Sequence, residues 1–204
     1  MSITTNAELL TAVTNWLDRT DLSARIPEFI VLFESMLNRR LEARQQITST
    51  TLTVTAGSAT LPTDYLAYKR VTWTGSPRRE LTYVTPTFLS SFNAAQASGA
   101  PTHFTIEGST LKVALLDNTS LEFLYAQKVP PIATTDPNWL LTAHPDAYLF
   151  GSLAAAKTFT SSDSNRGAAL SEFKMTVEGI VDDLSRLKFS QRSDVQQHVL
   201  VPTP

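Results

Sequence analysis

Apolar residues near both ends of the chain recur at intervals of three and four positions, the spacing of one face of an α-helix. In the first part of the chain they define two such faces: Leu9, Leu10, Val13, Trp16 and Leu17, then Ile26, Phe29, Ile30, Phe33, Met36, Leu37 and Leu41. Thr5 or Asn6 is suited to cap the first helix, and Pro27 is suited to the first turn of the second. The sequence therefore predicts two helices between residues 7 and 45.

The helical spacing returns after Pro130 and Pro131. A short helical turn at 138–141 precedes a helix from about Pro145 to Phe159 and a last helix from about Asp163 to Phe189. Small residues in the stretch 151–156 leave room for a second helix to approach closely. The apolar positions of the last helix form a near-heptad stripe: Leu170, Phe173, Val177, Ile180, Val181, Leu184 and Leu187.

Between these helical parts, from Ile47 to about Thr135, apolar and polar residues alternate with a period of two, which is typical of strands. Turn residues at 57–58, 75–77 and 107–109 separate the alternating runs. One helix, opened by Thr85 and Pro86 and running to about Gln96, interrupts the strands. The middle of the chain therefore predicts a small antiparallel sheet with one inserted helix.

Together these patterns predict an α+β fold. We expect a helical bundle built from both ends of the chain, residues 1–45 and 136–190, with residues 46–135 inserted as a small antiparallel β lobe and 191–204 as an extended C-terminal tail. Seven large apolar residues should share the core of the bundle: Trp16, Phe29, Phe33, Leu149, Leu153, Phe173 and Ile180.

Composition removes several classes of function. The chain of 204 residues has no cysteine, which excludes disulfides, thiol catalysis and thiolate metal sites. Its three histidines lie far apart, and its seven glycines form no phosphate-binding loop. We therefore expect no catalytic residue, no metal and no cofactor. The formal net charge of -2 is unlike that of a protein that wraps nucleic acid.

No apolar run is long enough for a membrane span, and the first residues do not form a secretory signal, which predicts a cytoplasm-like compartment.

Two basic clusters are candidate contact sites. Arg39, Arg40 and Arg44 fall toward the end of the second predicted helix, where they complement the helix dipole or contact a phosphate or an acidic partner. Tyr68, followed by Lys69 and Arg70, has the composition of a base-stacking site, but alternation along a strand explains it more simply. A nucleic-acid binder built on these five basic residues ranks behind the other functional hypotheses.

The last residues have no periodicity, yet several of them are apolar. Val195, Val199, Leu200 and Val201 precede Pro202, in a segment that ends with a second proline at Pro204. An isolated disordered end is usually more polar than this. The segment is therefore either a docking element that lies extended on a partner or a frayed terminus.

Several short runs, in order, are similar to one known family. The runs NWLL at 138–141 and HPDAYLFGSL at 144–153 resemble a sequence of the head-to-tail adaptor (connector) proteins of tailed bacteriophages, of the tail tubular protein A type. The runs WLDR at 16–19, IPEFI at 26–30, NRRL at 38–41, LPTDYL at 61–66 and GAPTHFTIEG at 99–108 resemble further parts of that family. Leu115 and Leu116 depart from it, because a proline is expected near that position.

The resemblance implies a virion structural protein in the neck of the particle. Such proteins form a ring, usually dodecameric, between the portal protein and the tail nozzle protein, and genomic DNA passes through the ring without sequence recognition. Related adaptors reach the portal with their C-terminal ends, which makes five residues candidate portal contacts: Val195, Val199, Leu200, Val201 and Pro202. Arg39, Arg40 and Arg44 are the secondary candidates. The alternative is a soluble α+β ligand-binding or regulatory domain that works as a monomer or dimer.

Overall fold

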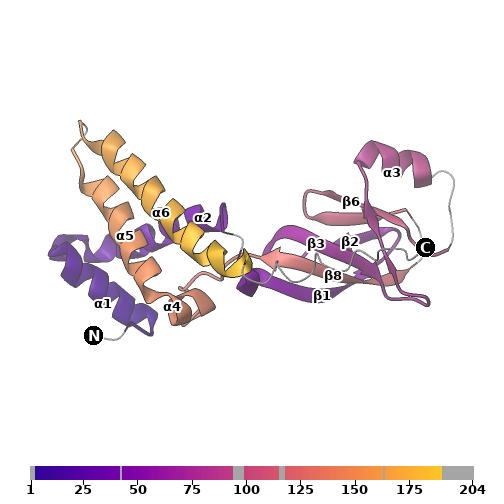
Figure 1. Cartoon of the computed structure of the whole chain (residues 1–204), viewed down its shortest axis with the longest axis horizontal. Coiled ribbons are helices and arrows are strands. Elements are labelled where there is room, and N and C mark those ends of the chain that lie inside the picture. Colours follow the sequence, from indigo (N-terminus) through magenta and orange to yellow (C-terminus); the bar gives the residue numbers. More distant parts are fainter. Residues whose placement is uncertain (1–2, 42, 94–98, 115–117, 163, 190–204) are drawn as a thin grey trace, which may run out of the picture. The chain divides into compact units, whose positions relative to one another are not determined.

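The computed structural model describes residues 3–41, 43–93, 99–114, 118–162 and 164–189 (Figure 1). Helices account for 47% of the residues and strands for 25%, which confirms the α+β class. The chain divides into two compact units. The first, the helical unit, contains the residues up to Gln45 and those from Val129 onward, and the second, the β unit, is Gln46–Lys128.

The described residues of the helical unit form five α-helices and a six-residue 3-10 helix. In order they are α1 (Asn6–Leu17), η1 (Thr20–Arg25), α2 (Ile26–Asn38), α4 (Trp139–Ala143), α5 (Pro145–Thr160) and α6 (Arg166–Phe189). Thr5 caps α1: its hydroxyl accepts from the Glu8 backbone N–H while the Glu8 carboxylate accepts from the Thr5 backbone. Pro27 and Pro145 lie in the first turns of α2 and α5, where a missing N–H costs nothing.

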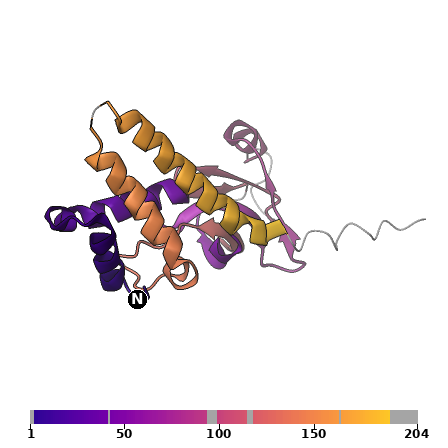
Figure 2. The ribbon, with the colours of Figure 1, turned by 60° about the vertical axis from the view of Figure 1, so that its left-hand side comes forward.

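Helix α5 lies between α1 and α6, as both views show (Figures 1 and 2). One hydrophobic cluster joins residues of all five helices with Val129 and Ile132. Phe29, Phe33 and Phe173 are buried in it. Leu149 is buried there as well, while Leu153 and Ile180 pack against its edge.

Trp16 was expected in this core, and that prediction is wrong: its side chain is 62% exposed. The buried side chains of α1 are those of Leu9, Ala12 and Val13. Leu17, in the same last turn, packs against the cluster, whereas Trp16 packs edge to face on Phe150, which is itself exposed on α5.

The described residues of the β unit form eight strands and one α-helix. They are β1 (Ile47–Val54), β2 (Ser58–Thr60), β3 (Tyr65–Trp73), β4 (Arg79–Glu80), β5 (Thr82–Tyr83), α3 (Pro86–Asn93), β6 (His103–Glu107), β7 (Thr110–Val113) and β8 (Thr119–Gln127). They form two four-stranded sheets with the strand orders β1-β8-β3-β4 and β2-β7-β6-β5. Residues from both sheets share one core, which includes Val54, Leu111, Leu121 and Phe123.

The prediction of one antiparallel sheet needs two corrections. First, the turn at Ala56 and Gly57, both with positive φ, carries the chain from β1 in one sheet to β2 in the other. Second, β5 and β6 pair in parallel. Helix α3 lies between them in the sequence, and a crossover containing a helix is the connection that parallel strands require.

The end of the β unit also differs from the predicted boundary at 135, because the unit ends at Lys128. Val129 is held to α2: its backbone N–H donates to Asn38 Oδ1 at 2.8 Å. Ile132 donates in the same way to Glu34 Oε1 at 2.8 Å. The segment after β8 therefore packs with the helices.

Candidate functional site

The helical unit contains a buried polar network centred on Glu34, in the middle of α2. Tyr148 of α5 donates its hydroxyl proton to Glu34 Oε1 at 2.8 Å, and the Ile132 backbone N–H donates to the same oxygen. Asn138 completes the network: its Nδ2 donates to the Tyr148 hydroxyl oxygen at 2.5 Å and to the Pro130 carbonyl at 2.7 Å. The network thus joins α2, α5 and the segment before α4.

Asn138 and Tyr148 belong to the two runs, NWLL and HPDAYLFGSL, that stand out in the sequence. Asn138 is also the N-cap of α4, because its Oδ1 accepts from the Leu141 backbone N–H at 2.9 Å. Both residues are almost completely buried, so no substrate reaches them. Their role is to position the helices.

Sequence reasoning missed Glu34, although a signal for it exists. Ile30, Leu37 and Leu41 lie four positions before, three after and seven after Glu34, so the glutamate falls on an apolar helix face. Burial raises the pKa of Glu34 above the ordinary carboxyl value, while the hydrogen bonds from Ile132 and Tyr148 act in the opposite direction. Burial also raises the pKa of Tyr148, and the charge of Glu34 adds to that effect.

Replacing Glu34 by glutamine is expected to change how stability depends on pH. Because the folded state raises the pKa of Glu34, it binds the proton more tightly than the unfolded chain. This stabilisation is complete below the ordinary glutamate pKa of about 4.3, and it is lost as the pH rises to the raised value. Glu34→Gln should remove that loss. Urea unfolding of both proteins between acidic and neutral pH measures it, as the difference between their free energies of unfolding at each pH.

Tyr148→Phe is the opposing variant in the same experiment. It removes a hydrogen bond that lowers the pKa of Glu34, so the pH window of the loss should widen. If the free energy of unfolding changes with pH in the same way for the native chain and for Glu34→Gln, the Glu34 carboxyl is not buried in this network.

The structure gives the three candidate arginines different surroundings. The predicted second helix ends earlier than expected, at Asn38, whose side chain holds Val129. Arg39 is therefore the C-cap residue of α2, and its Nε donates to the Ser35 carbonyl at 3.2 Å. Arg40 pairs with Glu178 of α6, and Arg44 begins the short 3-10 helix η2 (Arg44–Gln46). The prediction that all three stand at the end of one helix is wrong.

The candidate portal contacts Val195, Val199, Leu200, Val201 and Pro202 lie outside the described residues. Of the other basic cluster, Tyr68, Lys69 and Arg70 lie in β3 and all three are exposed. The expected alternation fails because the register between β3 and β8 shifts between Tyr68 and Arg70. Tyr68 stacks on Tyr83, with ring centroids 5.6 Å apart.

An apolar groove of about 550 Å³ lies on the helical unit, and α2, α5 and α6 all contribute to it. The lining residues are Glu28, Phe29, Leu32 and Met36 from α2 with its C-cap Arg39, Ala155, Thr158 and Phe159 from α5, and Arg166, Leu170 and Phe173 from α6. At the Phe159 end, the Arg25 guanidinium lies 5.1 Å from the ring centroid and pairs with Glu28 at 3.3 Å. We refer to this surface as the groove.

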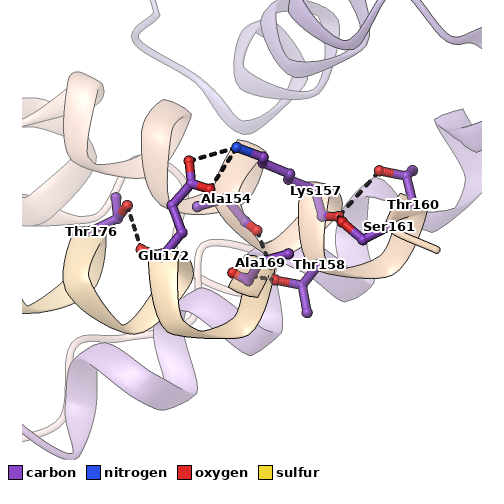
Figure 3. Close-up of polar contacts among 8 residues, drawn as sticks. All are labelled: Ala154, Lys157, Thr158, Thr160, Ser161, Ala169, Glu172 and Thr176. Atoms are coloured by element: carbon purple, nitrogen blue, oxygen red, sulfur yellow. Dashed lines mark hydrogen bonds and ion pairs between the residues drawn. The ribbon is translucent and has the colours of Figure 1, made fainter. Parts of the chain in front are cut away.

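Contacts between α5 and α6 hold two walls of the groove (Figure 3). Thr158 Oγ1 donates to the Ala154 carbonyl at 3.1 Å and to the Ala169 carbonyl of α6 at 3.3 Å. Lys157 Nζ lies 2.7 and 2.6 Å from the carboxylate oxygens of Glu172. That ion pair is exposed and contributes about 0–1 kcal/mol. The packing of Ala155, Ala156 and Phe173 therefore sets the spacing of the two helices more than the ion pair does.

Among the described residues, the groove is the surface that we consider as a candidate binding site. Within the part of the chain that the structure describes, no group of three or more histidine, aspartate or glutamate side chains could hold a metal ion. No described helix combines the length and apolar character needed to cross a membrane. The groove, with its mostly apolar walls, suits an apolar occupant.

A match to a known protein family spans both units. A family model with the description "SU10 adaptor protein" matches residues 4–200. No curated protein matches the chain.

Proposed function

Because the chain belongs to the SU10 adaptor protein family, a family of phage head-tail adaptors, we propose that its copies form a ring between the portal and the tail nozzle. The family places the protein among the structural proteins of the virion neck, in contact with other head and tail proteins. The match over residues 4–200 is the observation that carries the proposal.

The finer features of the proposal come from the order of the sequence runs described above. We assign the protein to the tail tubular protein A type and expect a ring, dodecameric as in related adaptors, that seals the filled head. Genomic DNA would pass through the ring without sequence recognition. The net charge of -2 supports this role, since tight binding to phosphates requires a basic surface.

Exposed apolar side chains on the helical unit support assembly. Trp16, Leu32 and Met175 expose more than half of their surface, on three different helices. Leu32 also lines the groove together with the exposed side chains of Phe159 and Leu170, and clustered apolar surface of this kind marks protein interaction sites. In the proposed ring, the helices from both ends of the chain form one bundle with the β unit, Gln46–Lys128, inserted between them in the sequence, and the bundles of neighbouring copies pack side by side.

Mixing the purified protein with assembled portal is the test of this function. We expect light scattering to show a complex whose added mass corresponds to a ring of copies, and electron microscopy to show that ring at one end of the portal. The protein alone can remain monomeric without contradicting the proposal. Absence of any complex with the portal of the same virus would contradict it.

A variant that lacks residues 190–204 tests the proposed portal contact in the same experiment. The described core residues end at Leu184, so the truncated chain should unfold at the same temperature as the full chain. It should nevertheless fail to join the portal, because Val195, Val199, Leu200, Val201 and Pro202 are missing. If the truncated protein assembles normally, the contact lies elsewhere, and Arg39, Arg40 and Arg44 become the next residues to replace.

The alternative of a soluble ligand-binding domain has one observation in its favour. The volume of the groove, about 550 Å³, lies within the range of small-molecule pockets, roughly 300–1,000 Å³. The portal experiment separates the two functions, because a ligand-binding monomer or dimer would add no ring to the portal.

A further inference from the structure

Strand β1 forms an open edge of the β unit. It stands first in the sheet order β1-β8-β3-β4, and among the described strands of that sheet it pairs with β8 alone (Figure 1). Its eight residues include no charged residue, no proline and no glycine, and their register with β8 continues without a shift from Ile47 to Val54. A long, regular edge of this kind is a template for pairing with another chain.

The other sheet edges that the structure describes carry features that prevent such pairing. Strands β2, β4 and β5 are three, two and two residues long. The part of β3 that extends beyond β4 carries Lys69 and Arg70, and its register with β8 shifts twice. Short strands, charges and bulges all protect a sheet edge. Of the described edges, β1 is therefore the one suited to accept another strand.

The two faces of β1 have different surroundings. Leu52 and Val54 are buried in the core that both sheets share, while Thr48 and Thr50 on the same face are only half-buried. The residues of the opposite face are all exposed: Ile47, Ser49, Thr51 and Thr53. A strand that extends the sheet beyond β1 would thus meet the core on one face and water on the other. An occupant with apolar side chains on one face fits these surroundings.

The last residues of the sequence, outside the described part, contain a run with this pattern. Residues 195–201 include no proline and no glycine, and they carry no formal charge when histidine is neutral. Val195, Val199 and Val201 are separated by even numbers of positions, so they share one face of an extended chain. Pro202 ends the run, because proline has no N–H to donate to a strand ladder. We call residues 195–201 the terminal run.

The terminal run also has the length and the reach that an added strand needs. It is seven residues long, against eight in β1. Five residues, 190–194, connect it to the end of α6 at Phe189, and when extended they span up to about 17 Å. The run can therefore leave its own helix and lie along an edge on a second copy.

From these observations we propose that the terminal run of one copy pairs with β1 of a neighbouring copy as an added strand. Main-chain hydrogen bonds supply the affinity in this mode of binding, and alternate side chains supply the specificity. The valine face of the run extends the core face of β1, while Leu200 and Pro202, on the opposite face, stay available to the portal. The inference rests on the proposed ring and names a contact between its copies. Such a contact joins different surfaces of identical chains and closes into a ring when its rotation allows.

Engineered disulfides test this pairing, and the absence of cysteine from the chain gives a clean background. Three variants combine His198→Cys with Ser49→Cys, Thr51→Cys or Thr53→Cys, so that every thiol lies on the face that the proposal leaves exposed. After assembly on the portal and mild oxidation, denaturing electrophoresis should show, for at least one variant, a ladder of covalent oligomers beyond the dimer. Each single-cysteine variant can give a dimer at most. A disulfide within one copy, seen as a monomer without free thiols, would overturn the proposal.

Thr60 provides a matched control at another sheet edge. It is an exposed threonine like Thr51, but it lies in β2, which is only three residues long. Thr60→Cys/His198→Cys should therefore give no ladder. A ladder as intense as that of the β1 variants would show that the terminal run has no preference for β1, and it would overturn the proposal.

Two adjacent prolines distinguish strand pairing from a purely apolar contact. Successive residues of a strand direct their N–H groups to opposite sides, so Val199→Pro/Leu200→Pro removes one ladder bond in either orientation while both side chains stay apolar. Added to the cross-linking variant, this change should weaken the ladder at least tenfold. Gln191→Pro/Ser193→Pro, in the residues before the terminal run, should leave the ladder unchanged. Ladders of equal intensity for the two proline variants would contradict pairing through the backbone.

The same assembly experiment separates this inference from the proposed function. A native chain that forms no ring on the portal would overturn both proposals. A ring that electron microscopy shows for all three cysteine variants, together with no ladder from any of them, would overturn only the pairing of the terminal run with β1.

Discussion

Truncating Phe33 to alanine is expected to lower the free energy of unfolding by about 3–5 kcal/mol. Phe33 is fully buried in the core of the helical unit, where its ring meets that of Tyr148 edge to face at 5.5 Å. The truncation removes this contact and leaves a cavity among helices that cannot close it. Urea unfolding of the full chain, followed by far-ultraviolet circular dichroism, measures the loss.

Phe150→Ala is the matched control for this experiment. It is the same substitution on a neighbouring helix, at a side chain that is 47% exposed. We expect it to cost no more than about 1 kcal/mol, as for surface positions in general. Equal losses for the two variants would mean that Phe33 does not belong to the core described above.

A single methyl group at Gly151 is expected to destabilise the protein by about 1–3 kcal/mol. A Cβ atom at this position of α5 would lie 2.2 Å from Cδ2 and 2.3 Å from Cε2 of Phe33. The Phe33 ring is enclosed and cannot move away, so Gly151→Ala forces α2 and α5 apart. The loss should appear as a lower urea midpoint at an unchanged slope.

Gly179 offers the opposite case within α6. A Cβ atom there meets nothing within 4 Å, so Gly179→Ala should stabilise the helix by about 0.5–1 kcal/mol.

The double variant Gly151→Ala/Phe33→Leu should lose less free energy of unfolding than the sum of the two single variants, because the smaller side chain admits the methyl group. Stabilisation by Gly151→Ala similar to that by Gly179→Ala would contradict the close approach of α2 and α5.

The residues that sequence patterns placed well are those whose surroundings lie nearby in the chain. Thr5 caps α1 as expected, Thr85 accepts from the Phe88 backbone N–H at the start of α3, and Gly108 forms the turn between β6 and β7. The helical spacing of Phe29 and Phe33 correctly predicted that they are buried. Each of these features depends on periodicity or on hydrogen bonds within one or two turns.

The predictions that failed depend on residues that are distant in the sequence. Trp16 has the spacing of a core residue, yet its side chain is exposed and packs on Phe150 of α5, a helix far away in the sequence. The second sheet and the parallel pairing of β5 with β6 follow from how the strands meet across the unit. Alternation within each strand is the same whether one sheet forms or two.

By itself, then, the sequence determined the types of the elements, their caps and turns, the absence of cysteine chemistry and the similarity to phage adaptors. The tertiary structure alone decided where α2 ends, that Glu34 is buried, and that residues of α2, α5 and α6 together form the groove. The hydrogen bonds made by Asn38 at the end of α2 and by Glu34 join residues 91, 98 and 114 positions apart. A local pattern cannot specify such partners, because the free energy that selects them arises only when the helices pack together.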